Sequence, residues 1–144
     1  AEALAEFKRA LELRRGLGYR PGEVINLHNI GDALLRMGDL GRAWAAFEQS
    51  RELAGECAWD RGVVMNDVFL HYLRGLRGED VLADLERDVV TAGKLGEKEM
   101  AHTARWCMAR LKLDTAAAMT IATECEAAGF PSLAKQIRDT TRSA

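Results

Sequence analysis

Apolar residues recur along this chain at the three- and four-residue spacing of amphipathic helices, most clearly between Val24 and Gly55. That stretch carries two apolar stripes, formed by Leu27, Ile30 and Leu34, and by Ala43, Phe47, Ser50 and Leu53. Residues three and four apart share one face of a helix, so each stripe predicts a helix with one side to bury. Gly38 can end the first helix and Asp39 can cap the second. So short a turn predicts that the two helices are antiparallel.

The same pattern predicts helices along the whole chain and no strand. Their approximate ranges are 2–15, 24–37, 42–54, 60–76, 81–95, 98–113, 116–128 and 131–142. Pro21 suits a first helical turn, Asp60 and Asp114 can cap helices, and Gly129 can end one. The last range is apolar on one side only, as the terminal helix of a stack needs to be. We therefore expect an all-α fold of about eight helices in one domain over residues 1–144.

Sliding the sequence along itself by 40 positions superposes similar residues. The matched pairs are Ala3 and Ala43, Phe7 and Phe47, Ala10 and Ser50, Glu12 and Glu52, Leu13 and Leu53, Tyr19 and Trp59, and Gly22 and Gly62. Further along, the match weakens. A fixed period of this size is typical of stacked helical repeats. We predict a partial repeat at 1–20, repeats at 21–58, 59–96 and 97–129, and a capping helix at 131–142.

Composition narrows the class of protein. With 144 residues and a formal net charge of -2, the chain lacks the basic character of nucleic-acid-binding domains. Its cysteines, Cys57, Cys107 and Cys125, share no C-x-x-C spacing, so we expect small core residues, no disulfide or zinc site, and a cytoplasmic location. No apolar run is long enough to span a membrane. The chain opens inside a helical pattern without Met, so we also expect a piece of a longer protein.

The order Leu27, Ile30-Gly31, Leu34, Ala43, Phe47, Ser50 resembles the tetratricopeptide repeat, with Leu27 and Leu34 in place of the usual Trp and Tyr. The resemblance implies that Gly31 allows close helix packing, and that Ala43 and Phe47 fill the contact with a neighbouring helix. It implies a right-handed superhelix of antiparallel helix pairs that binds proteins or peptides. The 40-residue spacing and the phrase NIGDALLRMGDLGRA are similar to elongated repeats in bacterial signalling proteins, where such arrays act as sensor or adaptor modules.

In such a superhelix the first helix of each pair lines the concave side. Rotating each helix by its apolar stripe predicts a groove formed by Ile25, His28, Asn29, Asp32, Arg36, Val64, Asp67, Val68, His71, Arg74, His102, Arg105, Trp106 and Lys112. Two acids against four Arg or Lys make this lining mildly basic, which favours an acidic peptide as ligand. The family's carboxylate clamp, which needs Lys and Asn together, is not matched, because Asn29 has no accompanying Lys.

Two other functions are compatible with the sequence. The helices could form a structural homodimer with no separate ligand. His28, His71 and His102 could form the metal site of a metal-dependent helical enzyme, or a pH-sensitive strip across successive first helices. Hydrogen bonding on a polar surface is the more ordinary role for these histidines, and Glu99 with His102 gives one E-x-x-H where a di-iron bundle needs two. No catalytic motif occurs, so we expect no enzyme and no cofactor. Trp106 is a candidate exposed binding residue.

Overall fold

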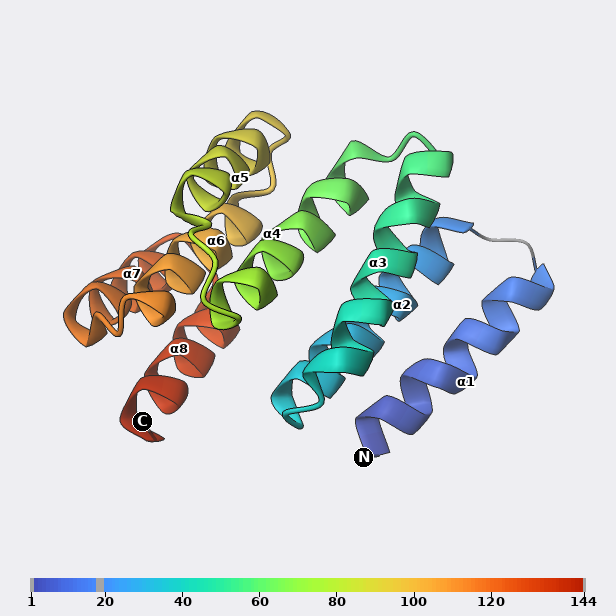
Figure 1. Cartoon of the computed structure of the whole chain (residues 1–144), viewed down its shortest axis with the longest axis horizontal. Coiled ribbons are helices and arrows are strands. Elements are labelled where there is room, and N and C mark those ends of the chain that lie inside the picture. The colour runs from blue at the N-terminus through green and yellow to red at the C-terminus, as the bar shows by residue number, and fades with distance from the viewer. Residues whose placement is uncertain (1, 18–19, 144) are drawn as a thin grey trace. The chain divides into compact units, whose positions relative to one another are not determined.

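The computed structural model of the protein describes residues 2–17 and 20–143, with side chains for residues 2–12 and 20–143. These described residues form eight α-helices and no strand (Figure 1). The helices are α1 (Glu2–Leu17), α2 (Arg20–Arg36), α3 (Leu40–Glu56), α4 (Asp60–Leu76), α5 (Leu82–Lys94), α6 (Lys98–Leu111), α7 (Thr115–Ala127) and α8 (Pro131–Ser143). The all-α class and the helical-repeat architecture are therefore confirmed.

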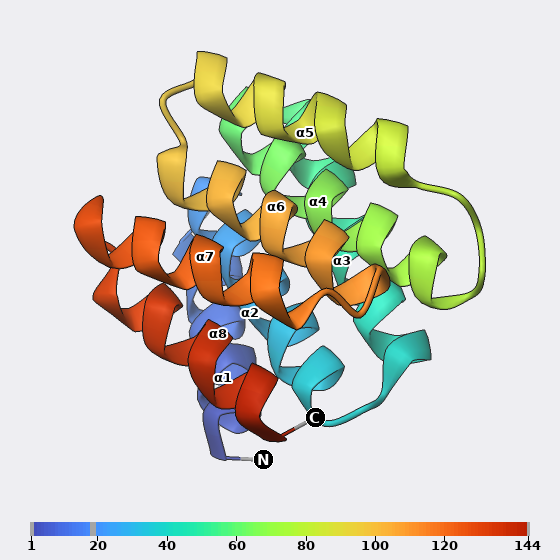
Figure 2. The same ribbon diagram turned by 90° about the vertical axis from the view of Figure 1, so that its left-hand side faces the viewer.

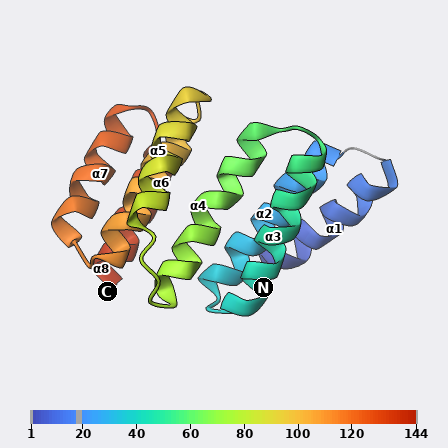
Figure 3. The ribbon, with the colours of Figure 1, turned by 45° about the horizontal axis from the view of Figure 1, so that its top comes forward.

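The backbone divides into two compact units, residues 1–73 and 74–144. In unit 1, α2 packs against both α1 and α3, and successive helices run in opposite directions (Figure 1). In unit 2, α5 pairs with α6 and α7 pairs with α8, while α6 also packs against α7 (Figures 2 and 3). The predicted division into repeats and the right-handed sense of winding remain predictions.

The turns between helices share one hydrogen-bonding pattern. In the turn after α2, the amide of Asp39 donates to the carbonyl of Leu34 at 2.9 Å, and the amide of Gly38 donates to the carbonyl of Leu35 at 3.0 Å. These two bonds form the Schellman motif, which satisfies carbonyls at a helix end. The same pair of bonds recurs after α3, α4, α5, α6 and α7. One turn geometry thus ends all six of these helices.

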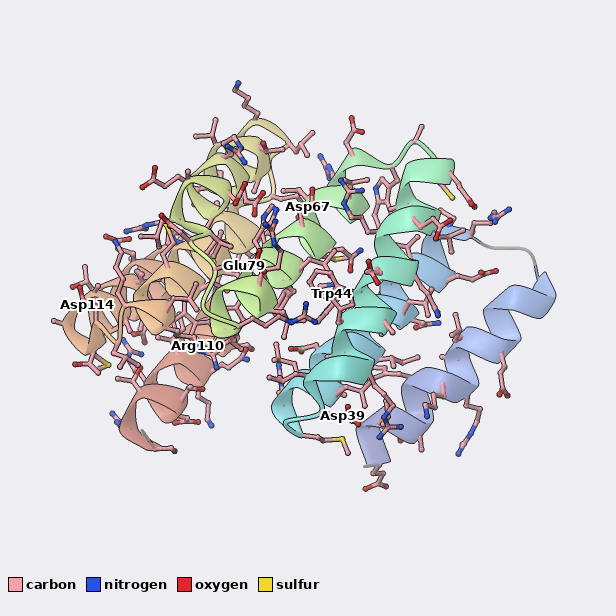
Figure 4. All side chains as sticks on the ribbon, in the orientation of Figure 1. Asp39, Trp44, Asp67, Glu79, Arg110 and Asp114 are labelled. Carbon is pink, nitrogen blue, oxygen red and sulfur yellow. The ribbon has the colours of Figure 1, made fainter. Side chains whose placement is uncertain are left out.

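Two aspartates cap helices as the sequence predicts. Figure 4 labels both, at the starts of α3 and α7. The Asp39 carboxylate accepts from the amide of Arg42 at 3.2 Å, and the Asp114 carboxylate accepts from the amide of Ala117 at 2.9 Å. Hydrogen bonds from Arg42 lower the pKa of Asp39. The expected cap at Asp60 is wrong, because α4 begins at Asp60 itself. Its carboxylate lies in the first turn, where the helix dipole favours a negative charge.

Leu113 carries a backbone strain that glycine avoids in the turns after α2, α4, α5 and α7. Its φ is +53°, and its side chain is 87% exposed. The left-handed conformation costs a residue with a Cβ roughly 1 kcal/mol or more. We expect Leu113→Gly to raise the free energy of unfolding by about 1 kcal/mol, measured by urea unfolding. Leu113→Ala is the control, because it removes the exposed side chain but retains the strain. An equal gain in both variants would contradict this explanation.

The core of unit 1 is centred on Phe47, which is 0% exposed. A Cβ placed on Gly31 would lie 2.8 Å from the Phe47 ring, closer than real Cβ contacts. Gly31 therefore allows α2 to approach α3, as the resemblance implied. Unit 2 has its own core cluster, which includes Trp106, Cys125 and Ile137. The three cysteines are free, but the expectation that all are core residues is wrong for Cys57, which is only partly buried.

Candidate protein-binding surface

A buried polar network joins α2, α3 and α4 within unit 1. The Ser50 hydroxyl donates to the carbonyl of Val24 at 2.7 Å. The Asn66 Nδ2 group donates to Ser50 Oγ at 2.8 Å and to the carbonyl of Gly62 at 2.9 Å. Asn66 Oδ1 lies 3.0 Å from His28 Nδ1. Ser50 and Asn66 are 0% exposed, so these hydrogen bonds replace those that water would provide.

The direction of each bond in this network is fixed. A carbonyl can only accept, so the Gly62 contact assigns Nδ2 of Asn66 as the donor and leaves its Oδ1 facing His28. His28 Nδ1 must then carry the hydrogen, and neutral His28 has an unprotonated Nε2. The ring lies 5.3 Å from the Phe47 ring and 5.1 Å from the Phe69 ring, between centroids. Burial lowers the pKa of His28, which favours this neutral form.

His28 therefore differs from its predicted place on an open groove. It is 8% exposed and packs in the core of unit 1. The sequence interpretation missed this because a histidine on an otherwise polar face gives no signal of burial. The burial of His28 depends on Asn66 and Ser50, which the sequence interpretation did not connect with it. Their side chains form the partner network that allows a polar ring to be buried.

Asn26 occupies the position 40 residues before Asn66, but its amide is unsatisfied. Asn26 is 4% exposed, and its Nδ2 has no hydrogen-bond partner in the described part of the chain. The same shift that matches Asn26 to Asn66 matches Ala10 to Ser50. Alanine supplies no oxygen to accept from the amide, so the lost partner has a sequence origin. The His28–Asn66 network is consequently not repeated at the equivalent place.

The structure corrects the register of the predicted surface on α4. α2 spans Arg20–Arg36 and α4 spans Asp60–Leu76, which is an offset of 40. The predicted positions on α4 lie 39 residues after their counterparts on α2: Val64 after Ile25, Asp67 after His28, and His71 after Asp32. The prediction was therefore shifted by one residue, which turns the predicted face of the helix by about 100°. At an offset of 40, the counterparts of Ile25 and Asn29 are Met65 and Phe69.

Contacts on α4 confirm that correction. Asp67 forms an ion pair with Arg51 of α3, so its side chain meets that helix. Val64 and Val68 are 2% and 0% exposed. His71 is partly buried. These four residues do not form one open face of α4.

The corrected arrangement gives a partly exposed surface on α2 and α4, which we call the α2–α4 surface. It consists of Ile25, Asn29 and Asp32 from α2 and Met65 and Phe69 from α4. Ile25 is 38% exposed, and the other four are partly buried. The ring contact between Phe69 and His28 shows that the two stripes adjoin. Asp32 pairs with Arg36 at 2.9 Å, so the predicted cation Arg36 is neutralised by its own helix.

Two of the three predicted cations of unit 2, Arg74 and Arg105, are also paired. Arg74 contacts Glu79 at 3.1 Å, and Arg105 contacts Glu124 of α7 at 2.5 Å. The hydrogen bond from Arg105 lowers the pKa of Glu124. Lys112 is exposed and ends α6. These carboxylate partners lie outside the predicted groove residues, so the basic character of the lining was overestimated from the sequence.

Trp106 is buried, which corrects its interpretation as an exposed binding residue. It is 4% exposed and belongs to the core cluster of unit 2. The guanidinium of Arg110 lies 4.7 Å from the centre of its ring, a cation–π contact that covers one face of the indole. His102 lies nearby on α6, with its ring 6.1 Å from that of Phe130. This part of α6 packs the unit together.

No three His, Cys, Asp or Glu side chains among the described residues form a group that could hold a metal ion. No helix in the same residues is both long and apolar enough to cross a membrane. The candidate functional site is the α2–α4 surface, which adjoins the His28–Asn66 network through Phe69.

A family profile described as the tetratricopeptide repeat matches residues 1–56. Searches of curated proteins and of solved structures found no match. The matched segment contains the Gly31–Phe47 contact and the Gly38–Asp39 turn. Tetratricopeptide repeats generally act as scaffolds for protein–protein interaction. The match supports a tetratricopeptide repeat over residues 1–56.

Proposed function

We propose that this chain is a protein-binding scaffold and that the α2–α4 surface receives the partner. The observation that carries the proposal is a partly exposed surface of mixed character on a rigid support. Ile25, Met65 and Phe69 offer apolar contact, while Asn29 offers hydrogen-bonding groups. The buried network behind them fixes the spacing of the two helices, so little conformational entropy is lost on binding.

The partner we propose is a peptide segment held mainly through apolar side chains. The sequence favoured an acidic peptide because of the arginines expected in the groove. Arg36, Arg74 and Arg105 each have a carboxylate partner within the chain, which weakens that argument. Methionine and aromatic side chains adapt to apolar ligand groups. An acidic segment remains the second ligand to test.

We further propose that the scaffold serves as the sensor or adaptor module of a larger bacterial signalling protein. The resemblance of its elongated repeats to such arrays supports this role. A scaffold with no catalytic motif of its own would contribute to signalling by holding a partner in place. Self-association into a homodimer is the alternative, and light scattering on the concentrated chain tests it directly: a strict monomer would contradict it.

Titration against a peptide library tests the proposed surface. The variants are Ile25→Glu and Asn29→Ala, with Val90→Glu as the matched control, because Val90 is 55% exposed on α5. We expect the apparent Kd of the best library peptide to rise at least about 10-fold in each surface variant, as for interface residues that cost more than 1 kcal/mol. The control should bind like the wild type. Unchanged binding by Ile25→Glu and Asn29→Ala would show that the surface is assigned wrongly.

A further inference from the structure

We propose that His28 is a proton-sensitive lock that holds α2 against α4 and loosens in mild acid. This inference does not depend on the identity of any partner. It comes from the position of a titratable ring at the centre of a buried network. The ring joins α2 to α4 through Asn66, and Asn66 joins both to α3 through Ser50.

The hydrogen-bond directions leave one place for an added proton. Nδ1 of His28 already donates to Asn66, so acid can protonate only Nε2. The new positive charge would lie on a ring packed against Phe47 and Phe69, with 8% of the residue exposed. Benzene rings cannot replace the water that an imidazolium ion loses on burial. Protonation therefore opposes the packing of α4 on α2.

The charged groups around the ring offset this cost only in part. Five charged or titratable residues of α2, α3 and α4 lie within about one helical turn, along the sequence, of His28 or of the residues that contact its ring. They are Asp32, Glu48, Arg51, Asp67 and His71. The hydrogen bond with Asn66, and after it the charge of Asp32 one turn along α2, raise the pKa of His28, but the Asp32 carboxylate is shared with Arg36. Arg51 and Asp67 are paired with each other. Burial is the larger effect, and the pKa of His28 in the folded protein lies below its ordinary value.

The direction of the pH effect follows from that pKa. In the unfolded chain the pKa of His28 is about 6.5, so acid protonates the unfolded state more readily than the folded state. The stabilisation is present above this value and is lost as the pH falls below it. If the folded ring stays neutral down to pH 5, the unfolding equilibrium constant rises up to about 30-fold between pH 7.5 and pH 5.

Urea unfolding of the full chain between pH 7.5 and pH 5 tests the lock. We expect wild type to lose stability over this range, and His28→Gln to lose most of the pH dependence, because glutamine can donate to Asn66 but cannot titrate. His71→Gln is the control on α4 and should keep the dependence. A dependence of equal size in His28→Gln would overturn the proposal.

Nuclear magnetic resonance titration of the wild-type imidazoles gives a second readout that needs no variant to fold. We expect His28 to titrate below the unfolded-state value and to be the Nδ1–H tautomer at neutral pH. Titration at or above about 6.5, or an Nε2–H tautomer, would overturn the proposal. Both outcomes remain readable if His28→Gln does not fold.

Discussion

Replacing Phe47 with alanine is expected to lower the free energy of unfolding by about 3 to 5 kcal/mol. The ring is 0% exposed and stacks on Phe69, with ring centres 5.1 Å apart. It also fills the space beside Gly31 and contacts the His28 ring. Removing it leaves a cavity between α2, α3 and α4 that three packed helices cannot close. Chemical denaturation followed by circular dichroism measures the loss.

Phe7→Ala is the matched control for Phe47→Ala. Phe7 is the counterpart of Phe47 at the 40-residue offset, but its side chain is only partly buried against the core of unit 1. Phe7→Ala should therefore lower the free energy of unfolding clearly less than Phe47→Ala does. Equal losses in the two variants would mean that Phe47 is not the centre of this core.

The second large expected effect is at Gly31, where replacement by alanine should lower stability although Gly→Ala in a helix usually raises it. In an exposed helix, Gly→Ala raises stability by about 0.5 to 1 kcal/mol, because alanine loses less backbone entropy on folding. We expect Gly31→Ala instead to lower the free energy of unfolding by about 1 to 3 kcal/mol. The new Cβ would lie 2.8 Å from the Phe47 ring. That ring cannot move aside, since Phe69 and His28 pack against it.

Gly55→Ala provides the comparison on α3. A Cβ at Gly55 would meet nothing within 4 Å, and the residue is exposed in the last turn of the helix. Its replacement should raise stability, measured in the same denaturation experiment. If Gly31→Ala also raises stability, the close approach of α2 and α3 is not set by Gly31.

The local chemistry of the turns made most of the helices predictable. Gly38 with Asp39 and Gly129 with Pro131 mark helix ends that depend on two or three neighbouring residues. Such signals do not require knowledge of the rest of the fold. The apolar stripe of Leu27, Ile30 and Leu34 was also placed correctly in the core, although His28 is buried as well.

The rotation of α4 could not be fixed in the same way. Apolar residues cover most of its circumference, including Val63, Val64, Val68 and Phe69. Apolar residues on most sides of a helix leave the centre of its buried face poorly defined by sequence, so a one-residue slip is easily made. The contacts that settle its rotation, Asn66 with His28 and Asp67 with Arg51, join residues 16 to 38 positions apart. Pairings at that separation cannot be derived from local pattern.

The site residues of unit 2 were even harder to predict from the sequence than those of α4. The internal repeat weakens after α4, so no earlier helix served as a template for α6. Trp106 was assigned to the predicted groove, together with Arg105, by rotating α6 on its apolar stripe. In the structure Arg110 lies over the indole, and Arg105 reaches Glu124 on α7. Long cationic side chains can cover an aromatic ring while their charged ends stay in water.

α2 and α4 both have 17 residues, and their first residues lie 40 positions apart, so this part of the chain is suited to tandem duplication. A second copy of residues 21–60 inserted after Asp60 would begin and end at the same point of the helical period. The copied Asn26 would then stand where Asn66 now stands, opposite a serine hydroxyl instead of Ala10. An array of this kind can lengthen by whole repeats without requiring a new type of turn between helices.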